Sequence, residues 1–270
     1  MISDEIKVQR DKMKGKGIRA QLDYFWTYYK VPFLIFLLVI LVLIYLIHFF
    51  MSKKDEVFGV TFLNVEHTAE ENTLSQMRDD LTKDLNKLFD LNSNQTVDID
   101  NSRYQTPGSS FNSTDLAVQS AILASMSAGT CDVAIMDAWN YEKYMSGGAF
   151  LDLRKVLSDE ELKALSGKIY YADRDSIGNE DEDYSGDNMG KGEEDISLAE
   201  AEGKEALSTY ILPDPTAMKD PVPVGILVND SAYLSKYKAY QKSAAILGVC
   251  NKTKDQKKAV EFIKFIMKNK

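Results

Sequence analysis

The strongest pattern along the chain is an uninterrupted apolar stretch at residues 31–51, which contains no formally charged side chain. A helix rises about 1.5 Å per residue, so this stretch spans the ~30 Å hydrocarbon core of a bilayer. A buried core helix is rarely apolar on every face over such a length. A cleaved signal peptide has a shorter apolar stretch that ends in small residues, whereas this one ends in HFFMSKKDE. The pattern therefore predicts an uncleaved signal anchor that crosses the membrane once.

After this stretch, short apolar strands alternate with amphipathic helices. β-Branched and aromatic residues predict strands at residues 57–65, 97–99, 133–136, 222–228 and 244–250. Capping residues predicted at Thr68, Thr114, Ser158 and Thr253 open helices that end near residues 88, 128, 165 and 267, and a short helix covers 139–145. This alternation indicates an α/β domain over residues 57–270. Its sheet is expected to be mainly parallel and covered by helices on both faces, which makes three layers.

The formal charge of −9 is concentrated in one segment. Residues 173–205 contain 13 acidic and 3 basic side chains, a net charge of −10, so the rest of the chain sums to +1. Residues 171–204 are also rich in glycine and poor in large apolar side chains, which predicts an acidic, flexible loop. Nucleic-acid binding requires a basic face, so the composition argues against a nucleic-acid partner.

The charges that flank the apolar stretch predict its orientation. Seven cations precede it, whereas only Lys53 and Lys54 follow it, and Asp55 and Glu56 come directly after them. The positive-inside rule places residues 1–30 in the cytoplasm and residues 57–270 outside the cell. Aromatic side chains just before the stretch suit the headgroup layer of the bilayer, and they are Tyr24, Phe25, Trp26, Tyr28 and Tyr29.

Two cysteines and one acidic run are candidates for covalent and metal chemistry. Cys131 and Cys250 both fall in the predicted outside portion, where a disulfide persists, and two buried free thiols are the alternative. The start of a calcium loop is matched by Asp181, Asp183, Ser185 and Asp187. The twelfth position of that loop should be glutamate but is Gly192, so the site would be weak, and a solvated loop is the alternative. No other cofactor is predicted.

Three segments resemble the extracellular solute-binding proteins of bacterial transporters. Residues 120–157 are similar to a helix, an Asp-Val strand (Asp132-Val133) and a Gly … Leu-Asp-Leu stretch of that family. Residues 222–234 resemble its strand that ends before an asparagine, here Asn229, and residues 245–267 resemble its closing strand and helix. Separately, residues 24–30 resemble uncharacterised single-pass proteins of Gram-positive anaerobes.

The resemblance implies a periplasmic-binding-protein-like fold reduced to one lobe. Two-lobed members place most of the second lobe between the asparagine-bearing strand and the closing helix. Here only residues 230–243 separate these elements, and 14 residues cannot build a lobe. A single lobe buries much less of a small molecule than two closing lobes do.

Ligands of open α/β sheets sit beyond the carboxyl ends of the strands. The residues predicted there are Asn64, Glu66, His67, Asp137, Trp139, Asn140, Tyr141 and Asn229. An aromatic ring beside amides and a carboxylate suits a sugar or a peptide. The alternative is that Trp139 fills the core and the polar groups cap helices.

The sequence does not indicate an enzyme. His67 is the only candidate base outside the membrane stretch, no Gly-x-Ser-x-Gly motif accompanies it, and both cysteines read as strand residues. The expected function is therefore a membrane-anchored module that recognises a ligand or partner outside the cell. The alternative is a non-catalytic accessory or structural subunit of a membrane-protein complex.

Overall fold

A computed structural model describes residues 17–65, 71–108, 112–178 and 197–268. The chain forms two compact units, Met1–Lys54 and Asp55–Lys270. In the first unit, helix α2 (Ile18–Ser52) contains the stretch Tyr29–Phe49, which is long and apolar enough to cross a membrane and is not buried by the rest of the protein. The helix begins at Ile18, well before the predicted residue 31, and it includes the aromatic segment ahead of Pro32.

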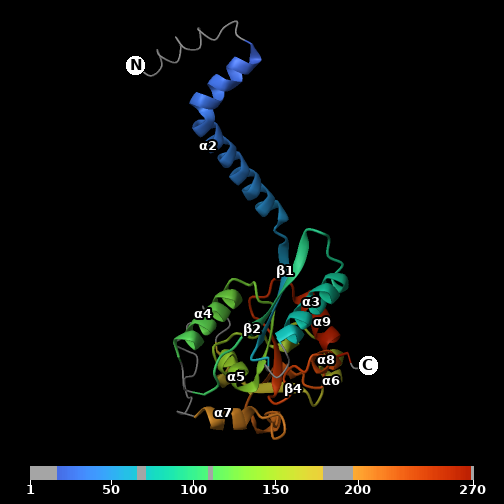
Figure 1. Ribbon diagram of the computed structural model, residues 1–270. Helices are drawn as coiled ribbons and strands as arrows, with labels where there is room; N and C mark the ends of the chain where they lie inside the picture. Colours follow the sequence, from blue (N-terminus) through green and yellow to red (C-terminus); the bar gives the residue numbers. More distant parts are fainter. Residues whose placement is uncertain (1–16, 66–70, 109–111, 179–196, 269–270) are drawn as a thin grey trace. The chain divides into compact units, whose positions relative to one another are not determined.

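The second unit is built on a six-stranded sheet with the order β2-β1-β3-β6-β5-β4 (Figure 1). The strands are β1 (Asp55–Leu63), β2 (Gln95–Arg103), β3 (Val133–Asp137), β4 (Ile169–Asp173), β5 (Pro221–Leu227) and β6 (Ala245–Val249). β1 pairs in parallel with β2 and with β3, whereas the pairs β3–β6, β6–β5 and β5–β4 are antiparallel. Strands β1, β2, β3 and β5 therefore run in one direction, and β6 and β4 run against them.

The reversed direction of β6 follows from its connection to β5. Residues 228–244 join the two strands, and the helix among them, α8 (Ala232–Lys236), has only five residues. A parallel return needs a crossover, usually an α-helix, that runs back along the whole length of the strands. Helix α8 is too short to do so, and β6 therefore starts at the edge where β5 ends.

Helices cover both faces of the sheet, as predicted. On one face, α3 (Glu71–Leu88) and α9 (Gln256–Ile266) bury side chains such as Leu81 and Phe262 against Val60 and Ile135. On the other face, α4 (Ser113–Ser127) and α5 (Ala138–Ser146) bury Ile122 and other apolar side chains against the alternate strand positions. Figure 1 shows α4 and α5 on the opposite side of the sheet from α3 and α9. The described residues also contain helices α6 (Asp159–Ala164) and α7 (Leu198–Glu205).

The predicted bounds of the loop at residues 171–204 are wrong at both ends. Residues 171–173 belong to β4, where Tyr170 and Ala172 are buried against the sheet. A capping box of Ser197 and Glu200 opens helix α7 within the predicted loop. The middle of the segment, residues 179–196, lies outside the described residues.

Helix starts differ in detail from the predicted capping residues. The capping box of Ser158 and Glu161 is present as predicted. Helix α4 is capped by Asn112 rather than by Thr114, because the Asn112 side chain accepts hydrogen bonds from two backbone N–H groups of the first turn. Helix α9 is capped by Asp255 rather than by Thr253. Thr68 lies outside the described residues.

One buried carboxylate ties three elements of the core together. Asp132, at the start of β3, accepts hydrogen bonds from the backbone N–H of Gly59 (2.8 Å), the hydroxyl of Thr253 (2.6 Å) and the backbone N–H of Lys254 (3.1 Å). A Cβ atom on Gly59 would lie only 1.8 Å from the carbonyl oxygen of Thr130. Strand β1 and the turn before β3 therefore lie too close together at this point for any residue other than glycine.

Candidate functional site

The predicted polar side chains do meet at the carboxyl ends of β1 and β3. The side chain of Asn64 bonds both backbone groups of Gln105, donating to its carbonyl oxygen (2.7 Å) and accepting from its N–H (2.7 Å). The amide of Asn140 donates to the carboxylate of Asp137 (2.9 Å) and approaches the same Gln105 carbonyl (3.4 Å). Asn64, Gln105, Asp137 and Asn140 thus form one buried polar cluster, which we call the edge cluster.

Two of the predicted site residues lie elsewhere and have structural roles. Tyr141 is buried, stacks on Phe150 and donates its hydroxyl to the carbonyl oxygen of Val224 (2.7 Å). Asn229 donates to the carbonyl oxygens of Tyr240 and Ser243 (2.9 Å each) and so closes the turn before β6. Neither residue belongs to the edge cluster. Glu66 and His67 lie outside the described residues.

Trp139 is the second residue of α5, two positions after the edge-cluster residue Asp137. Its side chain is half-buried, so it does not fill the core as the alternative interpretation required. The ammonium group of Lys204, from α7, lies 5.9 Å from the centroid of the Trp139 ring. The ring thus faces the last turn of helix α7.

A buried acid that the sequence pattern did not indicate lies beside the edge cluster. Glu205, the last residue of α7, is only 8% exposed, and its carboxyl group interacts with the carboxylate of Asp137 and the backbone N–H of Trp139. Burial, followed by the negative charge of Asp137, raises the pKa of Glu205 to about 10. Glu205 is therefore protonated at neutral pH. The signal in the sequence was the capping box at Ser197, which starts a helix that presents Ala201 and Glu205 on one face.

Three buried polar atoms around this site have no hydrogen-bond partner among the described residues. They are Nη1 of Arg103, Nε2 of Gln105 and Oε2 of Glu205. The other amide atom of Gln105, Oε1, accepts a hydrogen bond from the hydroxyl of Tyr144 (2.9 Å). Burial raises the pKa of this hydroxyl. Buried polar groups are almost always paired in folded proteins. Nε2 of Gln105 and Nη1 of Arg103 can donate to an acceptor-bearing molecule.

The two cysteines lie side by side in the core on the face of the sheet that α4 and α5 cover. The Sγ atoms of Cys131 and Cys250 are 3.5 Å apart, and both side chains are buried. Both are free thiols in the structure, so the predicted disulfide is not formed there, because the sulfur atoms lie beyond the ~2.05 Å length of a bond. Their proximity leaves oxidation of the pair as a testable prediction.

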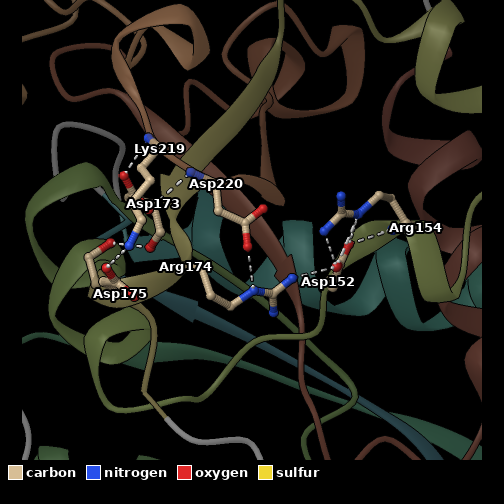
Figure 2. Close-up of polar contacts among 8 residues, drawn as sticks. Asp152, Arg154, Asp173, Arg174, Asp175, Lys219 and Asp220 are labelled. Atoms are coloured by element: carbon tan, nitrogen blue, oxygen red, sulfur yellow. Dashed lines mark hydrogen bonds and ion pairs between the residues drawn. The ribbon is translucent and has the colours of Figure 1, made fainter.

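A second polar cluster lies at the β4 edge of the sheet and has a structural role. Figure 2 shows Asp152 between the guanidinium groups of Arg154 (2.6 Å) and Arg174 (3.5 Å), and Arg174 also pairs with Asp220. Burial alone would raise the pKa of Asp152, but the hydrogen bonds and charges of the two arginines outweigh it and lower this pKa. The cluster holds the end of β4 to the turn that carries Asp152.

The four predicted calcium ligands, residues 181, 183, 185 and 187, lie outside the described residues. Within the part of the chain that the structure describes, no group of three or more His, Cys, Asp and Glu side chains is arranged to hold a metal ion.

The fold and the site together define a single apolar helix followed by an α/β domain with a polar edge cluster. No protein-family model, no curated protein and no solved structure matches this chain. The resemblance to solute-binding proteins is therefore an expectation from the sequence alone.

Proposed function

We propose that this chain is a membrane-anchored, extracellular, non-catalytic binding module of the solute-binding type. Its ligand site is the edge cluster together with the Trp139 ring. The observation that carries this proposal is a half-buried tryptophan whose backbone N–H bonds Glu205, two residues after an edge cluster in which Nε2 of Gln105 lacks a partner among the described residues. A ring that stacks on an apolar face and amides that bond hydroxyl or carbonyl groups suit a sugar or a peptide.

The location of the site supports the proposal. It lies at the carboxyl ends of the parallel strands β1 and β3, where open α/β sheets bind their ligands. The cation-rich segment before α2 supports a cytoplasmic N-terminus and therefore an extracellular domain. In this proposal α2 anchors the protein in the lipid bilayer.

Binding is tested with the full chain in lipid nanodiscs, titrated by calorimetry with a panel of neutral oligosaccharides and short peptides. We expect at least one class to bind, and we expect Trp139→Ala to weaken that binding by tenfold or more. The matched control is Trp26→Ala, which removes the other tryptophan, on α2, and should leave affinity unchanged. Binding that is insensitive to Trp139→Ala would place the ligand elsewhere and refute the site.

One observation favours a second function, that of an accessory subunit of a membrane-protein complex. Residues 116–131 carry no charged side chain, and the outer face of α4 exposes Leu116 (57%) with Ala117, Ser120, Ala121 and Ala124. Small residues allow another helix to approach closely. Co-purification of a stable membrane partner that Leu116→Asp releases, together with no binding of the ligand panel, would favour this second function.

A further inference from the structure

Helix α7 lies across the proposed ligand site. It packs against α5, and its last residues are tied to the segment before β6. The backbone N–H of Ala244 donates to the carbonyl oxygen of Glu205, and the N–H of Leu207 donates to that of Lys242, both at 2.7 Å. Ala244 in turn accepts from the N–H of Ala138 at the start of α5 (2.8 Å). Helix α7 therefore ends where β3 passes into α5.

Two side chains of α7 cover the ligand-binding residues. The carboxyl group of Glu205 occupies the position beside Asp137 and the backbone N–H of Trp139, and Lys204 lies over the Trp139 ring. A ligand that stacked on Trp139 and bonded the edge cluster would meet both side chains. A ligand and helix α7 would thus compete for the same binding groups.

Apolar packing holds α7 only weakly. The helix buries two side chains, and one of them is Glu205 itself. The other is Ala201, a single methyl group, while Leu198 remains 37% exposed. Segments with few buried apolar contacts open at low free-energy cost while the rest of the fold stays intact.

We propose that α7 is a displaceable strap whose Glu205 carboxyl is an internal occupant of the ligand site, and that ionisation of Glu205 releases it. This inference rests on the proposed function, because it concerns regulation of the same site. The groups that face Glu205 are mostly acidic or neutral: Asp137 from the end of β3, Glu202 from α7 itself and Tyr104 from the segment after β2. An ionised Glu205 would be repelled by Asp137 and would leave for water.

The direction of the pH effect follows from the raised pKa of Glu205. The closed strap binds a proton that the open strap, with Glu205 in water, releases above a pKa of about 4.5. The equilibrium constant for opening therefore rises by up to tenfold per pH unit, from about pH 4.5 toward the folded pKa of about 10.

The test is hydrogen–deuterium exchange on the full chain in nanodiscs between pH 6 and pH 9, with rates divided by the intrinsic rate at each pH. We expect the protection of the Leu207 and Ala244 amides to fall by up to tenfold per pH unit. Glu205→Gln should remove this dependence, because glutamine does not ionise. Glu202→Gln, an exposed change on the same helix, should retain it.

The core amide of Ile135 on β3 distinguishes strap opening from global unfolding. We expect it to be protected at least a hundredfold more strongly than the strap amides at pH 8. Equal protection of both sets, or a wild-type pH dependence in Glu205→Gln, would overturn the strap. This measurement needs no ligand. It can therefore refute the strap without refuting the ligand site at Trp139, and the ligand titration can refute that site without refuting the strap.

Discussion

Replacement of Glu205 by glutamine should make the stability of the protein less dependent on pH. Glu205 is buried and protonated in the folded state, and its pKa is about 10 there against about 4.5 in the unfolded chain. Between these values the folded chain holds one proton more than the unfolded chain. The contribution of Glu205 to the free energy of unfolding is therefore fully present below about pH 4.5 and is lost as the pH rises toward the folded pKa.

The size of the effect follows from the same two values. Each pH unit in the window changes the free energy of unfolding by about 1.4 kcal/mol. Between pH 6 and pH 8, Glu205→Gln should therefore gain about 3 kcal/mol over the wild type. The side chain of glutamine is isosteric and neutral, so it can stay beside Asp137 at every pH.

Urea unfolding of the full chain in detergent micelles, followed by near-UV circular dichroism from pH 5 to pH 9, measures this gain. Glu202→Gln is the control, because Glu202 lies on the same helix and is exposed, and its difference from the wild type should not vary with pH over this range. A difference between Glu205→Gln and the wild type that stays flat, or that shrinks as the pH rises, would show that Glu205 is not protonated in the folded protein.

Three further predictions concern the core and the β4 edge. Mild oxidation should join Cys131 to Cys250 and, because they are 119 residues apart, stabilise the protein by about 5 kcal/mol in the loop-entropy model. Thiol titration and urea unfolding with and without reductant measure this. Gly59→Ala should destabilise the fold by about 3 kcal/mol or more, because the added methyl meets a backbone oxygen at 1.8 Å. Asp152→Ala should destabilise it by about 1–3 kcal/mol through the loss of its arginine partners.

Two of these predictions have a matched control within the chain. Gly203→Ala adds a methyl to an exposed position of α7 with nothing within 4 Å, and it should stabilise that helix by up to about 1 kcal/mol. Asp175→Ala removes an exposed ion pair with Lys219 and should change stability by less than about 0.5 kcal/mol. Free alkylation of both cysteines in the oxidised, folded protein would contradict the disulfide. Equal effects of Asp152→Ala and Asp175→Ala would contradict the role given to Asp152.

The layers of the fold could be predicted from the sequence, but the direction of two strands could not. Five strands and the principal helices have strong periodic or β-branched patterns, and the structure contains all of them. The strand Ile169–Asp173 was missed because it is short, lies at an edge and runs directly into an acidic segment. The antiparallel direction of β6 depends on whether the segment after β5 crosses the sheet, which hydrophobic periodicity does not report.

Part of the candidate site was predictable for a related reason. The rule that ligands meet the carboxyl ends of parallel strands correctly brought Asn64, Asp137 and Asn140 together. The same rule failed for Asn229, because β5 is separated from β3 by β6. Gln105 and Glu205 were missed because their burial arises from long-range packing. The capping box at Ser197 indicates the helix that carries Glu205, but not that its last side chain is buried.

The strap also bears on the expectation that this domain is a single lobe. In two-lobed solute-binding proteins the second lobe closes over the ligand, and the resemblance implies that this chain has no such lobe. Residues 230–243 form only α8 and a turn, so they cannot cover the site. Helix α7 covers it instead, with one methyl group and one protonated acid as its buried attachments. In the strap proposal, such a cover gives way to a ligand without a hinge between lobes, and the proton on Glu205, rather than the area of a second lobe, determines how strongly it holds.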